Sequence, residues 1–292
     1  ILDAVKKEGL DSIMLSDRPL AAQIGGEVFN LRFTPKKDTQ IHLLRYGEDM
    51  GRRVYERTLQ FLFILAMRKE FPRARVCVRY SLGPGLFITV DGMEEPFNEE
   101  AALKVETEMR RLVRLKLPLE RRRISIKEAL SFYEQDGQAD KAKLLKWRRF
   151  SYFDVYQIDG YMDYFYGEMA PDTSYADVFR VKYVHDGAVV LLMPRSDAPD
   201  VPSDYVDLPK LHAVFHQSDE WGKLMECATV NDLNTHIQNG TIRELVRINE
   251  ALHDRGYADI ADKIVQKGAK AVLVAGPSSS GKTTSAHRIS TQ

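Results

Sequence analysis

A nine-residue segment near the end of the sequence constrains the fold more than any other part of the chain. Residues 276–284 read Gly-Pro-Ser-Ser-Ser-Gly-Lys-Thr-Thr and follow five apolar residues at 271–275. A Gly-x-x-x-x-Gly-Lys-Thr pattern between an apolar strand and a helix wraps backbone N–H groups around a phosphate. The sequence therefore predicts a strand at residues 272–275, a phosphate loop and the start of a helix.

The residue types of this loop each have a chemical role. Glycines allow the backbone to wrap a phosphate, a lysine adds a cation at the β- and γ-phosphates, and a threonine hydroxyl holds Mg²⁺. We expect Mg²⁺ with ATP as the ligand, with Thr283 as the metal-holding residue. The expected phosphate-binding residues are Gly276, Ser278, Ser279, Ser280, Gly281, Lys282, Thr283 and Thr284. The alternative is a Gly/Ser-rich connector that matches the pattern by chance.

The two ends of the sequence suggest a fragment. The chain starts at Ile1 rather than methionine and stops at Gln292, eight residues after the loop motif. Phosphoryl transfer also needs a second metal-holding acid and a base for the acceptor. We expect both beyond Gln292, so the catalytic residues are unknown and the fragment is not expected to catalyse this transfer.

Charge and cysteine content narrow the class of protein. The 292 residues include 42 Lys plus Arg and 42 Asp plus Glu, which argues against a generally basic nucleic-acid binder. Cys77 and Cys227 are the two cysteines and form no Cys-x-x-Cys pair, so a disulfide framework is excluded. Apolar runs stay far below the ~20 residues of a membrane span. We expect a cytoplasmic protein that does not interact with membranes.

Local patterns predict an α+β fold. Apolar runs at 20–24, 27–31 and 40–46 predict strands, with Gly25 and Gly26 as a hairpin turn. Helical periodicity from 54 to 67 ends before Pro72, and Asn98 is expected to cap the next helix. Further strands are expected at 75–80, 86–91, 178–185 and 188–193, and the helices should pack on one antiparallel sheet. The proline-rich segment 196–209 predicts a linker.

Several of these segments resemble known families. Residues 275–284 resemble the phosphate loop of the uridine kinase and phosphoribulokinase family. Residues 248–253 and 260–262 resemble the lead-in of a bacterial subgroup in which that kinase follows threonyl-tRNA-synthetase-like modules. Residues 20–46 resemble the TGS-type β-grasp domain. Residues 106–146, with Pro118, Arg122, Ser125 and Asp140, are similar to the second additional, or editing, domain of the synthetases.

The resemblance implies a domain order and a function. It divides the chain into a partial TGS-like β-grasp module at 1–48, an editing-like α+β domain at 49–196, a linker and helical segment at 197–268, and the truncated start of a P-loop kinase domain at 269–292. The complete protein would be a uridine kinase-like enzyme that transfers a phosphoryl group from Mg-ATP to a nucleoside sugar hydroxyl. Its N-terminal modules would regulate the enzyme, form a homo-oligomer or sense a ligand.

The sequence departs from the editing domains where their metal ligands lie. A His-x-x-x-His pair matches Arg57 and Phe61, and the later Cys and His match Phe165 and Met169. Zinc sites use Cys, His or carboxylate ligands. We therefore expect no zinc and a loss of editing chemistry, with the fold kept as a scaffold.

A second hypothesis is a tRNA- or RNA-binding module with a nucleotide-dependent switch. Arg121, Arg122 and Arg123, together with residues 146–149, offer cations, while Trp147, Tyr152 and Tyr156 offer rings for base stacking. The competing interpretation, which we favour from the charge balance, is a solvated surface beside an aromatic core.

His212 and His216 lie four residues apart on an expected helix. No third ligand is near them in the sequence, so we interpret them as ordinary histidines.

Overall fold

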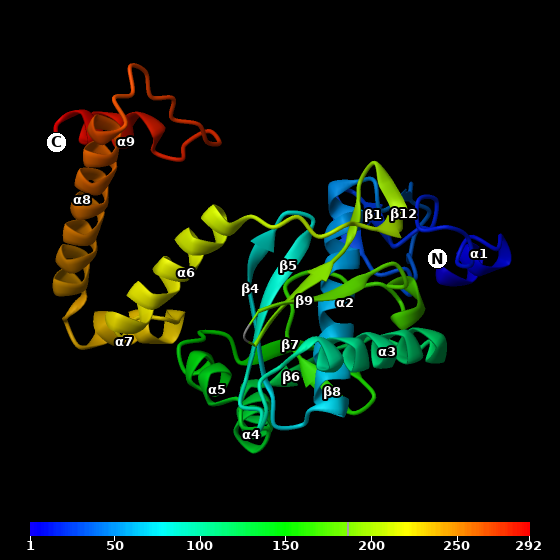
Figure 1. Cartoon of the computed structure of the whole chain (residues 1–292). Helices are drawn as coiled ribbons and strands as arrows, with labels where there is room; N and C mark the ends of the chain where they lie inside the picture. Colours follow the sequence, from blue (N-terminus) through cyan, green and yellow to red (C-terminus); the bar gives the residue numbers. More distant parts are fainter. Residues whose placement is uncertain (186) are drawn as a thin grey trace. The chain divides into compact units, whose positions relative to one another are not determined.

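The computed structural model describes residues 1–185 and 187–292. The chain forms two compact units, one made of residues 1–132 and 150–213 and the other of residues 133–149 and 214–292. Helices and small antiparallel sheets make up the first unit, and the described residues of the second unit form helices and turns (Figure 1). The predicted α+β class is confirmed.

The first unit begins with a short helix and a three-stranded sheet. Helix α1 covers Leu2–Lys7. The strands are β1 (Ala21–Ile24), β2 (Glu27–Phe29) and β3 (His42–Leu44), in the antiparallel order β2-β1-β3. Gly25 and Gly26 have φ of 57° and 89°, the left-handed values that a two-residue hairpin turn requires. The predicted hairpin is confirmed.

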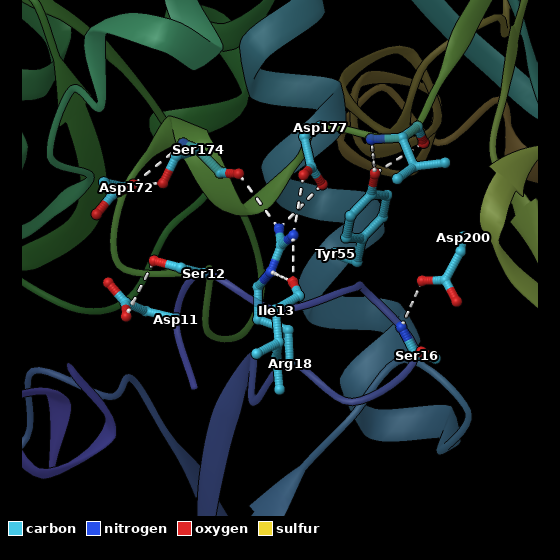
Figure 2. Close-up of polar contacts among 11 residues, drawn as sticks. Asp11, Ser12, Ile13, Ser16, Arg18, Tyr55, Asp172, Ser174, Asp177 and Asp200 are labelled. Atoms are coloured by element: carbon cyan, nitrogen blue, oxygen red, sulfur yellow. Dashed lines mark hydrogen bonds and ion pairs between the residues drawn. The ribbon is translucent and has the colours of Figure 1, made fainter. Parts of the chain in front are cut away.

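A buried arginine holds this N-terminal segment against a distant loop. The Arg18 guanidinium donates to both carboxylate oxygens of Asp177 at 2.9 Å and to the Ile13 carbonyl oxygen (Figure 2). Nearby, the Tyr55 hydroxyl donates to the Val178 carbonyl oxygen at 2.7 Å. Asp177 and Val178 follow the short 3-10 helix η1 (Thr173–Tyr175), so the segment before β1 is fixed to a loop about 160 residues later.

The central layer is a four-stranded antiparallel sheet with the order β4-β5-β10-β9. Its strands are β4 (Arg75–Leu82), β5 (Gly85–Asp91), β9 (Arg180–His185) and β10 (Ala188–Leu192), and its helical partners are α2 (Asp49–Glu70) and α3 (Glu99–Leu115). One face shares a core with both helices, through Leu86, Ile88, Val90, Val189 and Leu191. The opposite face packs Phe87, Val190 and Leu192 with Tyr205 and Leu208. Because both faces are covered, every residue of β10 is buried.

Helix boundaries follow the signals in the sequence. Helix α2 ends at Glu70, two residues before Pro72, as predicted. The Asn98 side chain accepts a hydrogen bond from the Ala101 N–H at 2.9 Å, and the Ser125 hydroxyl accepts one from the Glu128 N–H at 3.1 Å. These contacts satisfy amides that the first helical turn leaves without backbone partners. The expected Asn98 cap is confirmed.

A third sheet contains a strand that the sequence does not reveal. Strand β6 (Glu120–Ser125) pairs with β7 (Tyr152–Ile158), which pairs with β8 (Tyr161–Asp163). Helix α4 (Ile126–Gln135) follows β6 directly. A small hairpin of β11 (Pro194–Arg195) and β12 (Ala198–Pro202) occupies part of the segment that the sequence predicts as a linker.

The second unit is built from α5 (Ala139–Leu145), most of α6 (Pro209–Leu224), α7 (Val230–Gln238), α8 (Ile242–Gln266) and α9 (Lys282–Ser290). Helices α6 to α9 contain no buried residue.

The predicted strand at 272–275 is wrong: these residues form no strand, and Leu273 is 95% exposed. A short apolar strand is stable only when neighbours take up its N–H and C=O groups, and among residues 1–185 and 187–292 none pairs with it.

No helix among residues 1–185 and 187–292 combines the length and the apolar character that crossing a membrane requires.

Candidate functional site

The four positions that match the metal ligands of editing domains converge in the first unit. Arg57 and Phe61 lie on α2, and Phe165 and Met169 lie on the segment after β8. The Phe61 and Phe165 rings have centroids 5.3 Å apart, and Phe61 and Met169 are both fully buried. Among the described residues, no group of three or more His, Cys, Asp or Glu side chains is arranged to hold a metal ion. Phe61, Phe165 and Met169 therefore meet through apolar packing.

Arg57 lies half-buried beside the segment that carries Phe165 and Met169. Its Nε donates to the Glu168 carbonyl oxygen at 2.9 Å. Gly167 has φ of 105°, and a Cβ there would lie 2.9 Å from Arg57 Cζ, so the guanidinium packs directly on a backbone that only glycine allows. Burial lowers the pKa of Arg57, and the Tyr156 and Glu168 side chains act in the opposite direction. The cation closes the space and offers no lone pair to a metal.

Tyr156 holds the same segment from the other side. Its hydroxyl lies 3.1 Å from both the Gly167 carbonyl oxygen and Glu168 Oε2, and it accepts a hydrogen bond from the Met169 N–H at 3.2 Å. Burial raises the pKa of Tyr156, and the neighbouring Glu168 carboxylate raises it further. Tyr156 is 1% exposed, so its ring cannot stack on a nucleic-acid base as the sequence suggests. It belongs to the core.

Strand β6 places arginines beside this segment. Arg121 pairs with the carboxylates of Glu168 and Asp154, the latter at 3.0 Å, and Arg123 pairs with Asp154 at 2.8 Å. Hydrogen bonds from Arg123, supported by Arg121, lower the pKa of Asp154 despite its partial burial. The Arg123 guanidinium also lies 4.2 Å from the centre of the Tyr152 ring. The two arginines and two carboxylates form one network of ion pairs.

A cleft of about 380 Å³ opens where β6 meets the N-terminal segment. Its wall includes three arginines and two glutamates, and the lining residues are Asn30, Arg32, Leu119, Glu120, Arg121, Arg122 and Glu168. The Arg32 Nε donates to the Pro171 carbonyl oxygen at 3.1 Å, and the Asn30 amide donates to the Met169 carbonyl oxygen at 2.8 Å. Guanidinium groups bind phosphate oxygens through parallel hydrogen bonds, so this cleft can take a phosphate group.

Arg122 differs from its neighbours on the strand. Its guanidinium donates to the neutral Gln157 side chain at 2.6 Å, whereas Arg121 and Arg123 both pair with carboxylates. A cation bound to a neutral acceptor keeps its full charge toward an incoming anion. Among the arginines that line the cleft, Arg32 and Arg122 are the two whose hydrogen bonds go to neutral acceptors.

Sequence reasoning finds Arg121, Arg122 and Arg123 but misses their partners. Asp154 and Glu168 lie 33 and 47 residues beyond Arg121. Asn30 and Arg32 reach a segment 139 residues away. No local spacing in the sequence relates these residues. The pairing of β6 with β7 brings Asp154 beside the arginines, and contacts of the segment after β8 bring Glu168, Asn30 and Arg32 to the same place.

The predicted basic and aromatic positions at 146–149 belong to the second unit. The Trp147 indole N–H donates to the Asn231 side chain at 3.0 Å, and the ring is 37% exposed. Lys146 and Trp147 line a cleft of that unit beside α7, whereas Tyr152 lies in the first unit. The predicted basic and aromatic segment is divided between the two compact units.

The predicted phosphate loop lies between α8 and α9. Ser279 and Gly281 have φ of 60° and 79°, and α9 begins at Lys282. The Lys282 ammonium donates to the Pro277 carbonyl oxygen of the same loop, and Thr283 lies exposed in the first turn of α9. The eight predicted residues are adjacent, and the expected strand before them is absent.

Comparison with curated proteins identifies one class of relative. The threonine–tRNA ligase of Carboxydothermus hydrogenoformans is 27% identical over 175 residues, which are 57% of this chain and 26% of the ligase. The ligase of Clostridium kluyveri is 25% identical over 171 residues, covering 58% and 27%. The ligase of Acetivibrio thermocellus is 28% identical over 142 residues, covering 48% and 22%. This chain carries a threonyl-tRNA-synthetase-like domain.

The similarity covers only part of each ligase. The matched region spans about a quarter of the length of these ligases. No protein-family model matches the chain.

The prediction of a nucleoside kinase is wrong. The relatives described above are threonine–tRNA ligases, and none of them is a uridine kinase or another phosphotransferase that acts on nucleosides. The kinase prediction rests on the ten residues at 275–284, whereas the resemblance to the synthetases extends over a longer part of the chain. A short Gly-Lys-Thr loop recurs in many nucleotide-binding proteins, so it cannot by itself identify a kinase or its acceptor.

Proposed function

We propose that this chain is a tRNA-binding module that lacks metal-dependent editing chemistry. The observation that carries the proposal is the threonyl-tRNA-synthetase-like domain, whose relatives are ligases named for tRNA. The cleft beside β6 supports it, because Arg32 and Arg122 line one concave surface. Phosphate contacts by arginine position a protein on a nucleic acid and carry no sequence information by themselves.

The aromatic and apolar contacts at the former ligand positions support the second part of the proposal. Phe61, Phe165 and Met169 provide no imidazole, thiolate or carboxylate, and Arg57 provides a cation. Zinc-dependent hydrolysis needs a metal with an open coordination position that activates water. Neither requirement is met by these four side chains, so we expect RNA binding without hydrolysis of an aminoacyl ester.

The experiment is tRNA binding as a function of salt. Fluorescence anisotropy with labelled tRNA should show binding at low salt, with log K falling linearly as log salt rises. Arg122→Ala and Arg32→Ala should each reduce the slope by about 0.9 for a contact to duplex phosphate. Arg73→Ala serves as the control, because Arg73 is exposed, pairs with Glu94 and lies outside the cleft.

Two results would end this proposal. One is the absence of tRNA binding at about 50 mM salt, where phosphate contacts are strong. The other is an equal loss of affinity in all three arginine variants, because that outcome reports net charge rather than the cleft.

We also propose that the loop at 276–284 binds the phosphates of Mg-ATP and that its occupation changes tRNA affinity. The pattern of residues supports it, as do the left-handed Ser279 and Gly281 and the start of α9 at Lys282. Lys282 would leave the Pro277 carbonyl oxygen to meet the β- and γ-phosphates, and Thr283 would meet Mg²⁺.

Calorimetry with Mg-ATP, Mg-ADP and inorganic phosphate tests this second proposal. Lys282→Ala should abolish Mg-ATP binding, whereas Lys270→Ala, an exposed lysine outside the loop, should leave it unchanged. Binding that is equal in both variants would contradict the assignment. A tRNA affinity that is identical with and without bound Mg-ATP would contradict the switch and leave the loop as a nucleotide site.

A further inference from the structure

Two histidines that are distant in sequence meet in the first unit. His185 is the last residue of β9, and His212 lies in the first turn of α6. Their Nε2 atoms are 3.1 Å apart, and their ring centroids are 4.9 Å apart. His185, which lies 27 residues earlier in the sequence, is therefore a partner of His212 in the structure.

Two aromatic residues, Tyr80 and Phe87, contact the His212 ring and fix its position. The Tyr80 hydroxyl lies 2.8 Å from His212 Nδ1. The Tyr80 and Phe87 rings stack with centroids 5.0 Å apart and planes 8° apart, and Phe87 lies 4.9 Å from the His212 ring. A hydrogen bond at one ring nitrogen fixes the orientation and the tautomer of the other. This arrangement directs His212 Nε2 toward His185.

We propose that His185 and His212 bind a divalent late first-row transition metal ion through their Nε2 atoms. Metal–imidazole bonds of about 2.0–2.1 Å place two ligand nitrogens roughly 2.9 Å apart at a right angle and about 3.4 Å apart at the tetrahedral angle. The observed separation of 3.1 Å lies between these values. A metal can therefore bind both nitrogens without a shift of the backbone.

Small side-chain movements are sufficient for binding. His185 is exposed, so its ring can turn until its Nε2 lone pair and that of His212 point at one ion. In the bound state both Nε2 atoms are unprotonated and both Nδ1 atoms carry hydrogen. His212 Nδ1–H then donates to the Tyr80 hydroxyl oxygen. Both imidazoles stay neutral, so the binding of the ion to a neutral pair releases no proton.

The donor set defines the class of ion. Imidazole nitrogen suits Cu²⁺, Ni²⁺ and Zn²⁺, whereas Mg²⁺ and Ca²⁺ require oxygen ligands. Among residues 1–185 and 187–292, no third His, Cys, Asp or Glu side chain joins this pair in a metal-binding cluster. The proposed site connects the end of β9 to the start of α6 within the first unit.

Titration of the metal-free chain with Ni²⁺, followed by NMR of the histidine rings, tests the proposal. Paramagnetic broadening should affect His185 and His212 first, and calorimetry should give one ion per chain. His185→Ala should remove this binding, and it should leave the fold intact because His185 is exposed. His253→Ala, at an exposed position on α8, is the matched control and should bind like the unmodified chain.

A conservative variant separates orientation from ligation. Tyr80→Phe keeps the stacked ring but removes the hydroxyl that faces His212, and loss of such a supporting contact lowers metal affinity by about 10-fold to 100-fold. Retention of the same Ni²⁺ affinity in His185→Ala would overturn the proposal. Broadening of His212 with His216 but not with His185 would also overturn it, because the ion would then bind the helical pair.

Discussion

The rings of Phe61 and Phe165 pack against each other at 5.3 Å between centroids, with an angle of 51° between their planes. This contact joins α2 to the segment after β8, where the resemblance to editing domains implies metal ligands. Aromatic packing can hold two elements together without a metal, because each ring buries a large apolar surface. This contact between α2 and the segment after β8 needs no metal ion, and it should contribute measurably to stability.

Replacement of Phe61 by alanine tests that contribution. Phe61 is fully buried and also packs against Tyr161, so Phe61→Ala should lower the free energy of unfolding by about 3–5 kcal/mol. Urea denaturation followed by circular dichroism measures the change. Phe150→Ala is the control, because Phe150 is 61% exposed and its loss should change stability by about 0.5 kcal/mol or less. Equal effects of the two variants would show that the Phe61 contact is not a structural support.

The sequence predicts those parts of the fold that depend on local signals. Pro72 ends α2, Asn98 caps α3, and Gly25 with Gly26 forms a hairpin, because each effect acts over a few residues. Strand β6 is different. Its residues Glu120 to Arg123 are all exposed and charged, and only the pairing with β7 makes them a strand. Tertiary context overrides strand propensity at such an edge.

The candidate sites also differ in whether their residues are close together in the sequence. The loop residues 276–284 are adjacent in sequence, so their pattern is visible, but the expected strand at 272–275 lacks partners among the described residues. The pair of His185 and His212 and the bond between Arg32 and Pro171 join distant segments, so no spacing indicates them. The division of the chain at residues 48, 196 and 268 stays a prediction.

The ion pair between Arg18 and Asp177 should stabilise the first unit. Arg18→Ala removes a buried guanidinium and leaves the Asp177 carboxylate without it, which should cost about 3 kcal/mol, at the low end for a buried pair because Asp177 is 33% exposed. A double-mutant cycle with Asp177→Ala, measured by urea denaturation, should show that the two losses do not add. Arg195→Ala, which breaks an exposed pair with Asp197, should cost less than about 1 kcal/mol. Fully additive losses would contradict direct coupling.

Substitution by alanine should change helix stability in opposite directions at two helical glycines, Gly51 and Gly256. A Cβ at Gly51 in α2 would lie 2.0 Å from the Arg45 carbonyl oxygen, so Gly51→Ala should destabilise α2 by about 1–3 kcal/mol. A Cβ at Gly256 in α8 would meet nothing within 4 Å, so Gly256→Ala should stabilise α8 by about 0.5–1 kcal/mol. Native-state hydrogen exchange measures each helix separately. A gain of protection in α2 from Gly51→Ala would show that the Arg45 carbonyl group moves aside.

The network around Asp154 should make stability depend on pH in the acidic range. Hydrogen bonds from Arg123 and Arg121 lower the pKa of Asp154 in the folded chain below its ordinary value of about 3.9 in an unfolded chain. A carboxyl group with a lowered folded pKa binds fewer protons in the folded state. Its stabilising contribution is therefore complete above the ordinary pKa and is lost as the pH falls through the lowered one.

Asp154→Asn should remove this component of the acid dependence. Free energies of unfolding from urea titrations between pH 7 and pH 2 should fall less steeply below about pH 4 in the variant than in the unmodified chain. Asp38→Asn is the control, because Asp38 lies in an exposed loop outside the network, and the acid slope should not change. An unchanged acid slope in Asp154→Asn would mean that Arg121 and Arg123 do not favour the ionised carboxylate. The arginines of β6 would then be equally free to meet an RNA phosphate.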